Sequence, residues 1–131
     1  MDNLKRRSRW TLCLKYDTVT QVQPAIFHPR ALEAIRSFPR AARFALGEAI
    51  RDLQNGHRLV MPLSRPMPQV GRGVQELRVR DAAGSYRAFC LCVSARGVLV
   101  FHAFEKRTQK TPGREIDLGR RRLKELLHGK N

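Results

Sequence analysis

The first half of the chain has the apolar spacing of helices. One predicted helix face is formed by residues three or four positions apart, namely Ala42, Leu46, Ala49, Ile50 and Leu53. Pro39 suits the first turn of this helix, where its missing N–H group costs nothing, and Asn55-Gly56 is a strong C-terminal stop. A shorter helix is expected over residues 30–37. Together the two segments predict a helical hairpin.

The second half alternates between apolar and polar residues, which is typical of strands. Strands are expected over residues 74–80, 85–93 and 98–105, and tight turns join them at Ala83-Gly84 and Arg96-Gly97. These three segments predict an antiparallel meander.

Further elements complete the pattern. A short strand is expected at residues 24–28, a loop without regular structure at 57–73, and a terminal helix from about Pro112 to His128, with Ile116, Leu123 and Leu127 on its apolar stripe. The order is strand, two helices, three strands, helix. It predicts a small α+β fold with an antiparallel sheet, an N-terminal helical hairpin and a C-terminal helix.

The length of 131 residues is typical of one domain, which we place at residues 24–131. Residues 1–23 are interpreted as a basic N-terminal arm, either flexible or forming a short extra strand. Apolar runs are too short for a membrane span, and the basic N-terminus lacks the apolar stretch of a signal peptide, so a cytoplasmic protein is expected. The three cysteines form no Cys-x-x-Cys pair, which argues against a zinc site or a disulfide framework.

Charge is the most unusual property of the chain. There are 26 Lys and Arg residues against 11 Asp and Glu residues, a formal net charge of +15, and most of the cations are arginines. Guanidinium groups bind phosphates through two parallel hydrogen bonds and stay charged at any working pH. A polyanionic partner is therefore expected, RNA or the ribosome before a membrane.

The predicted turns also set a register for the sheet. With two-residue turns, Arg80 faces Arg87 and Arg87 faces Lys106. One face is then a core face for the helical hairpin, with Leu77, Val79, Tyr86, Ala88, Cys90, Cys92, Leu99, Phe101 and Ala103. The other face carries Glu76, Arg78, Arg80, Arg87, Phe89, Leu91, Val93, Val100, His102, Phe104 and Lys106.

Like charges opposite each other destabilise a sheet, so this cationic end breaks a local rule, as functional sites often do. The alternative is that the arginines extend into solvent or pair with Glu76, Asp81 and Glu105. Residues 105–112 extend the cluster with Lys106, Arg107, Thr108 and Lys110 just before a helix, which is a setting that suits a phosphate.

Other chemistry is weakly signalled. No Ser-His-Asp, Cys-His or metal-ligand spacing is visible. His102 is more typical of a packed histidine than of a catalyst, and Cys90 and Cys92 are interpreted as buried thiols.

Two strings of residues resemble a known family. Residues 76–81 (ELRVRD) with Tyr86-Arg87, and residues 103–112 (AFEKRTQKTP), are similar to the phage-derived branch of the RelE/HigB-type toxins of bacterial toxin–antitoxin systems. The resemblance runs from about Pro24 to Leu127, with Arg107 where the family usually has lysine. The expected order of elements fits the compact RelE-like fold.

The resemblance implies an mRNA interferase, a ribonuclease that cuts mRNA, generally on the ribosome. In such enzymes the 2′-hydroxyl of the RNA attacks the adjacent phosphate, and neither a metal nor another cofactor is needed. The resemblance also implies a cognate antitoxin that covers the basic face, usually a helix-turn-helix protein.

The family's site residues transfer to matching positions of this chain. Arg87 matches the sheet arginine after an aromatic residue, Arg78 and Arg80 match basic positions on the preceding strand, and Lys106 and Arg107 match the basic pair after the last strand. Glu76 stands where some relatives have lysine. Glu76, His102, Tyr86 and Lys106 are the candidates for the general base, and the predicted RNA-binding residues are Arg107, Lys110, Thr108 and Arg114.

Two other functions fit the same charge. A non-catalytic nucleic-acid-binding accessory protein of a phage would keep the basic face, whereas a purely structural subunit would have its charge neutralised by an acidic protein. A neighbouring gene for a small helix-turn-helix protein would favour the toxin.

Overall fold

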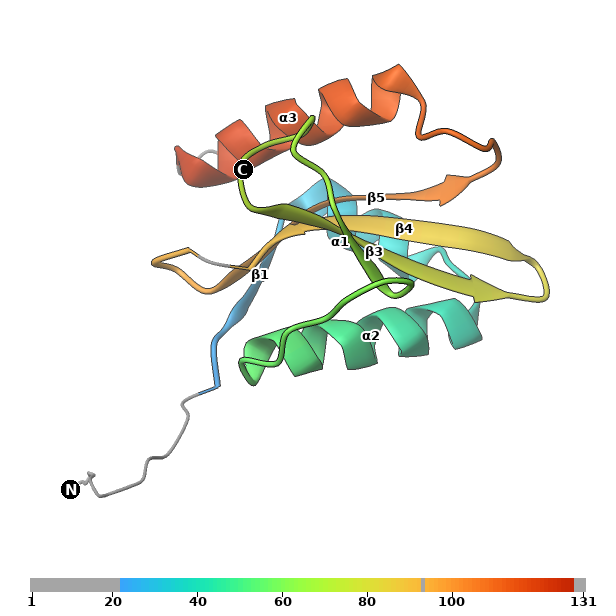
Figure 1. The fold of residues 1–131 in the computed structure, drawn as a ribbon, viewed down its shortest axis with the longest axis horizontal. Coiled ribbons are helices and arrows are strands. Elements are labelled where there is room, and N and C mark those ends of the chain that lie inside the picture. Colours follow the sequence, from blue (N-terminus) through green and yellow to red (C-terminus); the bar gives the residue numbers. More distant parts are fainter. Residues whose placement is uncertain (1–21, 93, 129–131) are drawn as a thin grey trace.

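The computed structural model describes residues 22–92 and 94–128, so Val93 and all but the last two residues of the predicted arm lie outside the described residues. The sheet lies between helices on its two faces (Figure 1). The elements along the chain are β1 (Ala25–Phe27), α1 (Pro29–Arg36), α2 (Arg40–Gln54), β2 (Ser64–Pro66), β3 (Val74–Asp81), β4 (Gly84–Leu91), β5 (Val98–Lys106) and α3 (Gly113–Leu127). The predicted α+β class is confirmed.

The sheet is mixed rather than antiparallel throughout. Its strand order is β1-β5-β4-β3-β2, and β1 runs parallel to β5 while the other pairs are antiparallel. The prediction of a purely antiparallel sheet is therefore wrong at β1, because alternation within a strand carries no information on the direction of its neighbour. The segment 57–73 also contains β2, although no regular structure was expected there. Three residues with a proline at the end are too few to show a period.

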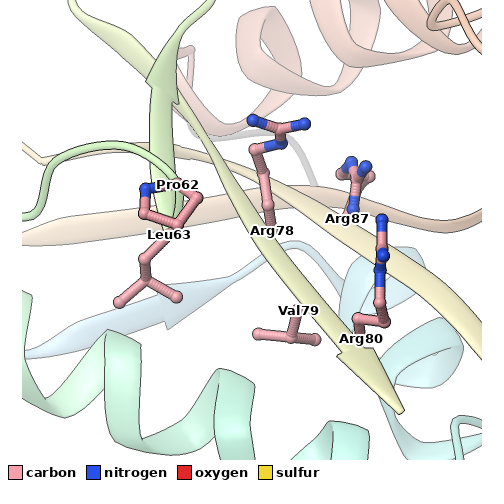
Figure 2. Close-up of a pocket in the computed structure, with 6 residues that line it drawn as sticks. All are labelled: Pro62, Leu63, Arg78, Val79, Arg80 and Arg87. Atoms are coloured by element: carbon pink, nitrogen blue, oxygen red, sulfur yellow. The ribbon is translucent and has the colours of Figure 1, made fainter. Parts of the chain in front are cut away.

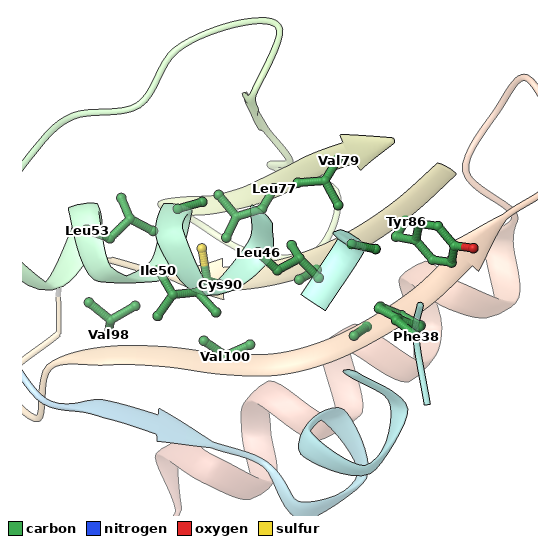
Figure 3. Packing of buried hydrophobic residues seen from close by; sticks show 14 residues of the cluster. Phe38, Leu46, Ile50, Leu53, Leu77, Val79, Tyr86, Cys90, Val98 and Val100 are labelled. Atoms are coloured by element: carbon green, nitrogen blue, oxygen red, sulfur yellow. The ribbon is translucent and has the colours of Figure 1, made fainter. Parts of the chain in front are cut away.

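Two apolar cores lie on opposite faces of the sheet. Helix α2 covers one face, and its buried residues are the ones predicted from spacing (Figure 3). Helix α3 covers the other face through Leu123 and Leu126, whereas Leu127, predicted on this stripe, is exposed. Gly119 lets α3 lie close to the sheet, because a Cβ at this position would come within 2.8 Å of the Phe89 ring.

A β-bulge corrects the predicted faces. Phe89 pairs with His102 but Cys90 pairs with Val100, so Phe101 is an extra residue in β5. An extra residue reverses the alternation on one side of the bulge. Leu99 and Phe101 therefore pack beneath α3, and Val100 packs on the α2 side, contrary to the prediction for all three.

The β3–β4 turn shifts the predicted register by two positions. Asp81 pairs with Gly84, and the Asp81 carboxylate accepts hydrogen bonds from the Ala83 and Gly84 backbone N–H groups at 2.8 and 3.0 Å. The turn thus begins earlier than expected. Arg87 faces Arg78 on β3 and Phe104 on β5, so the predicted pairs of Arg87 with Arg80 and with Lys106 are wrong. A shift of two keeps every β3 and β4 side chain on its predicted face.

Candidate functional site

Cationic side chains gather on the α3 face of the sheet, at the end that α3 leaves open. Figure 2 shows Arg78, Arg80 and Arg87 extending from neighbouring strands on the same side of the sheet. We use the name arginine cluster for six residues: Arg65, Glu76, Arg78, Arg80, Arg87 and Lys106. Strand pairing alone brings β2, β3, β4 and β5 together here, so the cluster is set by the fold rather than by one local motif.

The cluster borders a hollow of about 390 Å³, which we call the polar hollow. Its walls come from β3, the β3–β4 hairpin, the end of β5 and the following loop, and they comprise Arg78, Arg80, Ser85, Arg87, Lys106, Arg107, Thr108 and Gln109. The lining has cations, hydroxyl groups and one amide but no carboxylate. It is therefore a concave surface suited to an anion.

Glu76 lies beneath this surface and is fully buried. Its carboxylate oxygens lie 3.4 Å from an Arg65 nitrogen and 3.9 Å from nitrogens of Arg78 and Arg87. Thr111 donates a hydrogen bond to the same carboxylate at 3.2 Å, which ties the loop after β5 to the sheet. Glu76 is thus enclosed by cations and is out of reach of a molecule in the hollow.

The sequence did not single out Arg65 or Thr111. Arg65 faces Glu76 across the β2–β3 pair, so only recognition of the short strand β2 would have found it. Thr111 lies at the end of the basic segment predicted to bind phosphate, but its partner is thirty-five residues away along the chain. No local pattern indicates that contact.

The charges of the cluster do not balance. One buried carboxylate serves the guanidinium groups of Arg65, Arg78 and Arg87, and Arg80 and Lys106 add further positive charge. In the described part of the chain, the buried Nε atoms of these three arginines and Glu76 Oε1 have no hydrogen-bond partner. Buried polar atoms are nearly always paired in folded proteins, so Glu76 and these guanidinium groups are only loosely satisfied among themselves. The guanidinium groups of Arg78 and Arg87 also line the polar hollow, where phosphate oxygens would match their charge and geometry.

Arg87 is the best-held cation of the cluster. It is only 5% exposed, and its guanidinium donates to the Tyr86 carbonyl at 3.3 Å. Burial lowers the pKa of Arg87, and Glu76 opposes this effect, so the guanidinium stays charged. The Tyr86 ring points to the opposite face, where it packs against Phe38 with ring centroids 4.8 Å apart. Tyr86 is therefore not a group of the hollow, and burial raises its pKa.

Lys106 is the titratable group that lines the polar hollow. Burial lowers the pKa of its amine, and the nearby positive charge of Arg87 lowers it further. Both effects make the neutral amine more accessible than in an ordinary lysine. Lys106 is consequently the cluster's candidate for proton transfer.

The predicted RNA-binding residues divide into two groups. Arg107 and Thr108 line the polar hollow, with Arg107 paired to Glu105 at 3.0 Å. Lys110 and Arg114 are exposed and do not line it, and Arg114 lies 3.5 Å from Glu115 at the start of α3. The four predicted RNA-binding residues therefore do not form one compact site. They form a basic surface that runs from the polar hollow to the start of α3.

His102 lies apart from the arginine cluster, beneath α3. Its Nδ1 accepts from Arg122 at 2.7 Å, and its Nε2 then donates to Glu115 at 2.7 Å. We call these three residues the histidine cluster. An arginine can only donate, so Nδ1 carries a lone pair and the ring is neutral in the fold. Burial is the main cause that lowers the pKa of His102, the Glu115 hydrogen bond opposes it, and the Arg122 charge adds to it. Both ring nitrogens are already engaged, which leaves neither for a substrate.

Residues 22–92 and 94–128 lack the features of two other classes of protein. No helix there is long and apolar enough to cross a membrane. No group of three or more histidine, cysteine or acidic side chains is placed to hold a metal ion in this same part of the protein.

Comparison with known proteins gives a family. A comparison with curated proteins finds no match. Residues 33–124, from within α1 to within α3, match the family described as phage-derived protein Gp49-like (DUF891), which is a RelE/toxin-like family. The matched span includes β3, β4 and β5 and therefore the arginine cluster. The chain belongs to the Gp49-like family of phage-derived proteins.

Proposed function

We propose that this chain is the toxin of a type II toxin–antitoxin system and an mRNA interferase that cuts mRNA on the ribosome. The observation that carries the proposal is the arginine cluster, a set of cations with too few carboxylates around a hollow suited to phosphate. Membership of a phage-derived, RelE/toxin-like family supports a toxin with a RelE-like fold.

The proposed reaction uses the RNA's own 2′-hydroxyl as nucleophile. Its oxygen loses a proton and attacks the adjacent phosphorus, the bond to the 5′-oxygen of the next nucleotide breaks, and that oxygen takes up a proton from water. The products are a 2′,3′-cyclic phosphate and a free 5′-hydroxyl. Negative charge builds up on the phosphorane oxygens. Arg87 and Arg78, held in place from below by Glu76, stabilise that charge without moving, as preorganised donors do.

The proton steps fall to Lys106 in this proposal. Glu76 is fully buried under arginines, Tyr86 points to the other face, and His102 has both ring nitrogens engaged under α3. Lys106 lines the hollow with a lowered pKa, so its neutral amine accepts the 2′-hydroxyl proton near neutral pH more readily than an ordinary lysine would. The same cationic surface is what an acidic segment of an antitoxin would cover.

The alternative is a phage accessory protein that binds nucleic acid without cutting it. The arginine cluster suits both functions, because phosphate binding needs the same cations. The RelE/toxin-like family and the presence of Lys106 in the polar hollow favour the toxin. The two differ in chemistry: only the toxin makes cyclic-phosphate ends, and only the toxin requires a proton-transfer group.

The proposal is tested by expressing the chain alone and together with the helix-turn-helix protein of a neighbouring gene. Expression alone should stop growth and translation within minutes, and co-expression should restore both. A matched control is the Arg87→Ala chain expressed at the same level. Normal growth with abundant folded wild-type protein would contradict the proposal.

A further inference from the structure

Arg78, Arg80 and Arg87 border a second hollow beside the polar one. It measures about 410 Å³, and its remaining lining is apolar, from Pro62, Leu63 and Val79 (Figure 2). We call it the apolar hollow. The two hollows thus share three guanidinium groups, but the rest of the lining is polar in one hollow and apolar in the other. Both lie within the roughly 300–1,000 Å³ range of small-ligand sites.

This pairing of surfaces matches the two halves of a nucleotide. A phosphate needs the cations and hydroxyl groups of the polar hollow and nothing more. A nucleobase is flat and apolar on its faces, and it stacks on guanidinium planes and on apolar side chains. An anion alone, or an acidic side chain of a partner, would leave the apolar hollow without a role.

The apolar hollow also has a free strand edge. Strand β2 pairs with β3 only as far as Ser64 opposite Leu77. The Arg78 backbone N–H then donates to the Leu63 carbonyl at 2.8 Å. Because backbone groups alternate along an antiparallel strand, those of Arg80 point toward the same edge, where the described chain supplies no partner strand. A donor and an acceptor are thus available to read the edge of a base.

Arg78 is oriented for such a role. Its guanidinium donates to the Met61 sulfur at 3.6 Å, and its Nε lies 3.9 Å from Glu76. These two neighbours restrict the side chain, which borders both hollows. A held guanidinium loses little conformational freedom when a base stacks on it.

We infer that the apolar hollow is a subsite for one unpaired nucleobase, next to the phosphate bound in the polar hollow. The inference rests on the proposed function and extends it, because it assigns a base-contacting surface and hence a source of sequence preference. The RNA must be single-stranded here, since bases stacked within a duplex cannot enter a side hollow.

The test uses two probes that cannot be cleaved, a 2′-fluoro adenine dinucleotide and its counterpart with both bases removed. Amide NMR spectra of the full chain are recorded as each probe is added. The dinucleotide should shift the Leu63, Val79 and Arg80 amides together with those of Ser85 and Thr108. The abasic probe should shift only the latter pair. Identical shift patterns for the two probes would overturn the inference.

Variants then separate the base contact from a structural effect. Leu63 and Leu59 are both half-buried against the core beneath α2, but only Leu63 lines the apolar hollow. Leu63→Ala and its matched control Leu59→Ala should therefore lower the melting temperature alike. Only Leu63→Ala should weaken dinucleotide binding, by about 5-fold, the effect of losing roughly 1 kcal/mol of apolar contact. The affinity of both variants for the abasic probe should stay unchanged.

The remaining outcomes also decide the matter. Should Leu63→Ala weaken both probes equally, the apolar hollow would not be a base site. Should it leave the dinucleotide unaffected but weaken the complex with the antitoxin, the hollow would be a protein contact instead. Failure of the toxin proposal shows separately, as wild-type protein that leaves growth and mRNA intact while the dinucleotide still binds as expected.

Discussion

The arginine cluster and the histidine cluster lie on the same face of one sheet, yet they satisfy their polar groups differently. In the histidine cluster His102 lies 2.7 Å from both Glu115 and Arg122, and α3 covers the set. In the arginine cluster the carboxylate lies 3.4–3.9 Å from its guanidinium partners, and several buried nitrogens have no hydrogen-bond partner among the described residues.

The difference distinguishes a structural cluster from a candidate functional site. A cluster whose donors and acceptors match is complete and holds α3 onto the sheet. A cluster with surplus positive charge next to a hollow is costly unless an anion binds there. Mutation of the histidine cluster should therefore change stability alone, whereas mutation of the arginine cluster should change activity.

The largest effect should come from Arg87. Arg87→Ala should lower mRNA cleavage by about 10²–10³-fold or more, because one preorganised donor to the phosphorane is lost. Arg87→Lys should be nearly as damaging, since one ammonium group cannot replace a forked contact. Turnover should fall far more than ribosome affinity. The measurement is cleavage on programmed ribosomes, with binding and melting curves for each variant.

A matched control removes the same charge elsewhere. Arg51→Ala changes an exposed residue of α2, on the opposite face of the sheet, and should leave cleavage nearly unchanged. A melting temperature that falls in step with activity in Arg87→Ala would make Arg87 a structural residue, and the comparison between the clusters would fail.

Lys106 should give the next largest effect. If its neutral amine takes the 2′-hydroxyl proton, cleavage should rise with pH up to its pKa, which burial and Arg87 hold below the ordinary lysine value. Lys106→Arg keeps the charge but does not titrate, so it should remove that rising limb and lower the plateau rate by about 10²-fold. A pH–rate profile of unchanged shape in Lys106→Arg would exclude Lys106 from proton transfer.

Glu76→Gln should affect both stability and site. It leaves the guanidinium groups around it without their counter-charge, which should cost about 1–3 kcal/mol in the free energy of unfolding. Added inorganic phosphate should then raise the melting temperature of the variant more than that of the wild type. Glu105→Gln, at a more exposed carboxylate paired with Arg107, should cost less than about 1 kcal/mol. Equal losses of unfolding free energy in Glu76→Gln and Glu105→Gln would contradict the role of Glu76 as the buried counter-charge of the arginines.

His102 should give the smallest effect, and only on stability. Burial lowers its pKa in the fold, so below the unfolded value of about 6.5 the unfolded chain binds more protons and stability falls as the pH falls. His102→Gln should remove that loss of stability at acid pH while leaving cleavage at neutral pH intact. Urea unfolding between acid and neutral pH measures it, with the exposed His57→Gln as control. Loss of cleavage in folded His102→Gln would place His102 in the site.

Local patterns sufficed for much of the fold. Apolar spacing located α2 and its buried face, and alternation located β3, β4 and β5 within one or two residues. The bulge at Phe101 could not be predicted, because it depends on how neighbouring strands pair. The early turn at Asp81 has a local signal that the prediction missed, since aspartate side chains commonly accept backbone N–H groups in turns. The parallel pairing of β1 with β5 joins segments far apart in the sequence.

The candidate site was also predictable only in part: which residues share a face was predictable, but most of their contacts were not. Side-chain alternation placed Arg78, Arg80 and Arg87 on one face even with the register shifted, because a shift of two preserves the face. Pairing with Glu76 was the stated alternative, and Arg78 and Arg87 do lie 3.9 Å from its carboxylate. The contacts of Glu76 with Arg65 from β2 and Thr111 from a loop were not foreseeable. The separation of His102 from the arginines likewise follows from its contacts with α3, which the sequence does not show.

The chemistry of the RNA ends tests the central claim most directly. Total RNA is collected shortly after induction of the wild-type chain and of Arg87→Ala, and the new ends are sequenced after treatments that distinguish cyclic phosphates from other termini. If the arginine cluster is the catalytic site, the wild type should produce mRNA fragments with 2′,3′-cyclic phosphate and 5′-hydroxyl ends. The folded Arg87→Ala variant should produce none. Growth arrest with intact mRNA, or the same cut ends in Arg87→Ala, would contradict it.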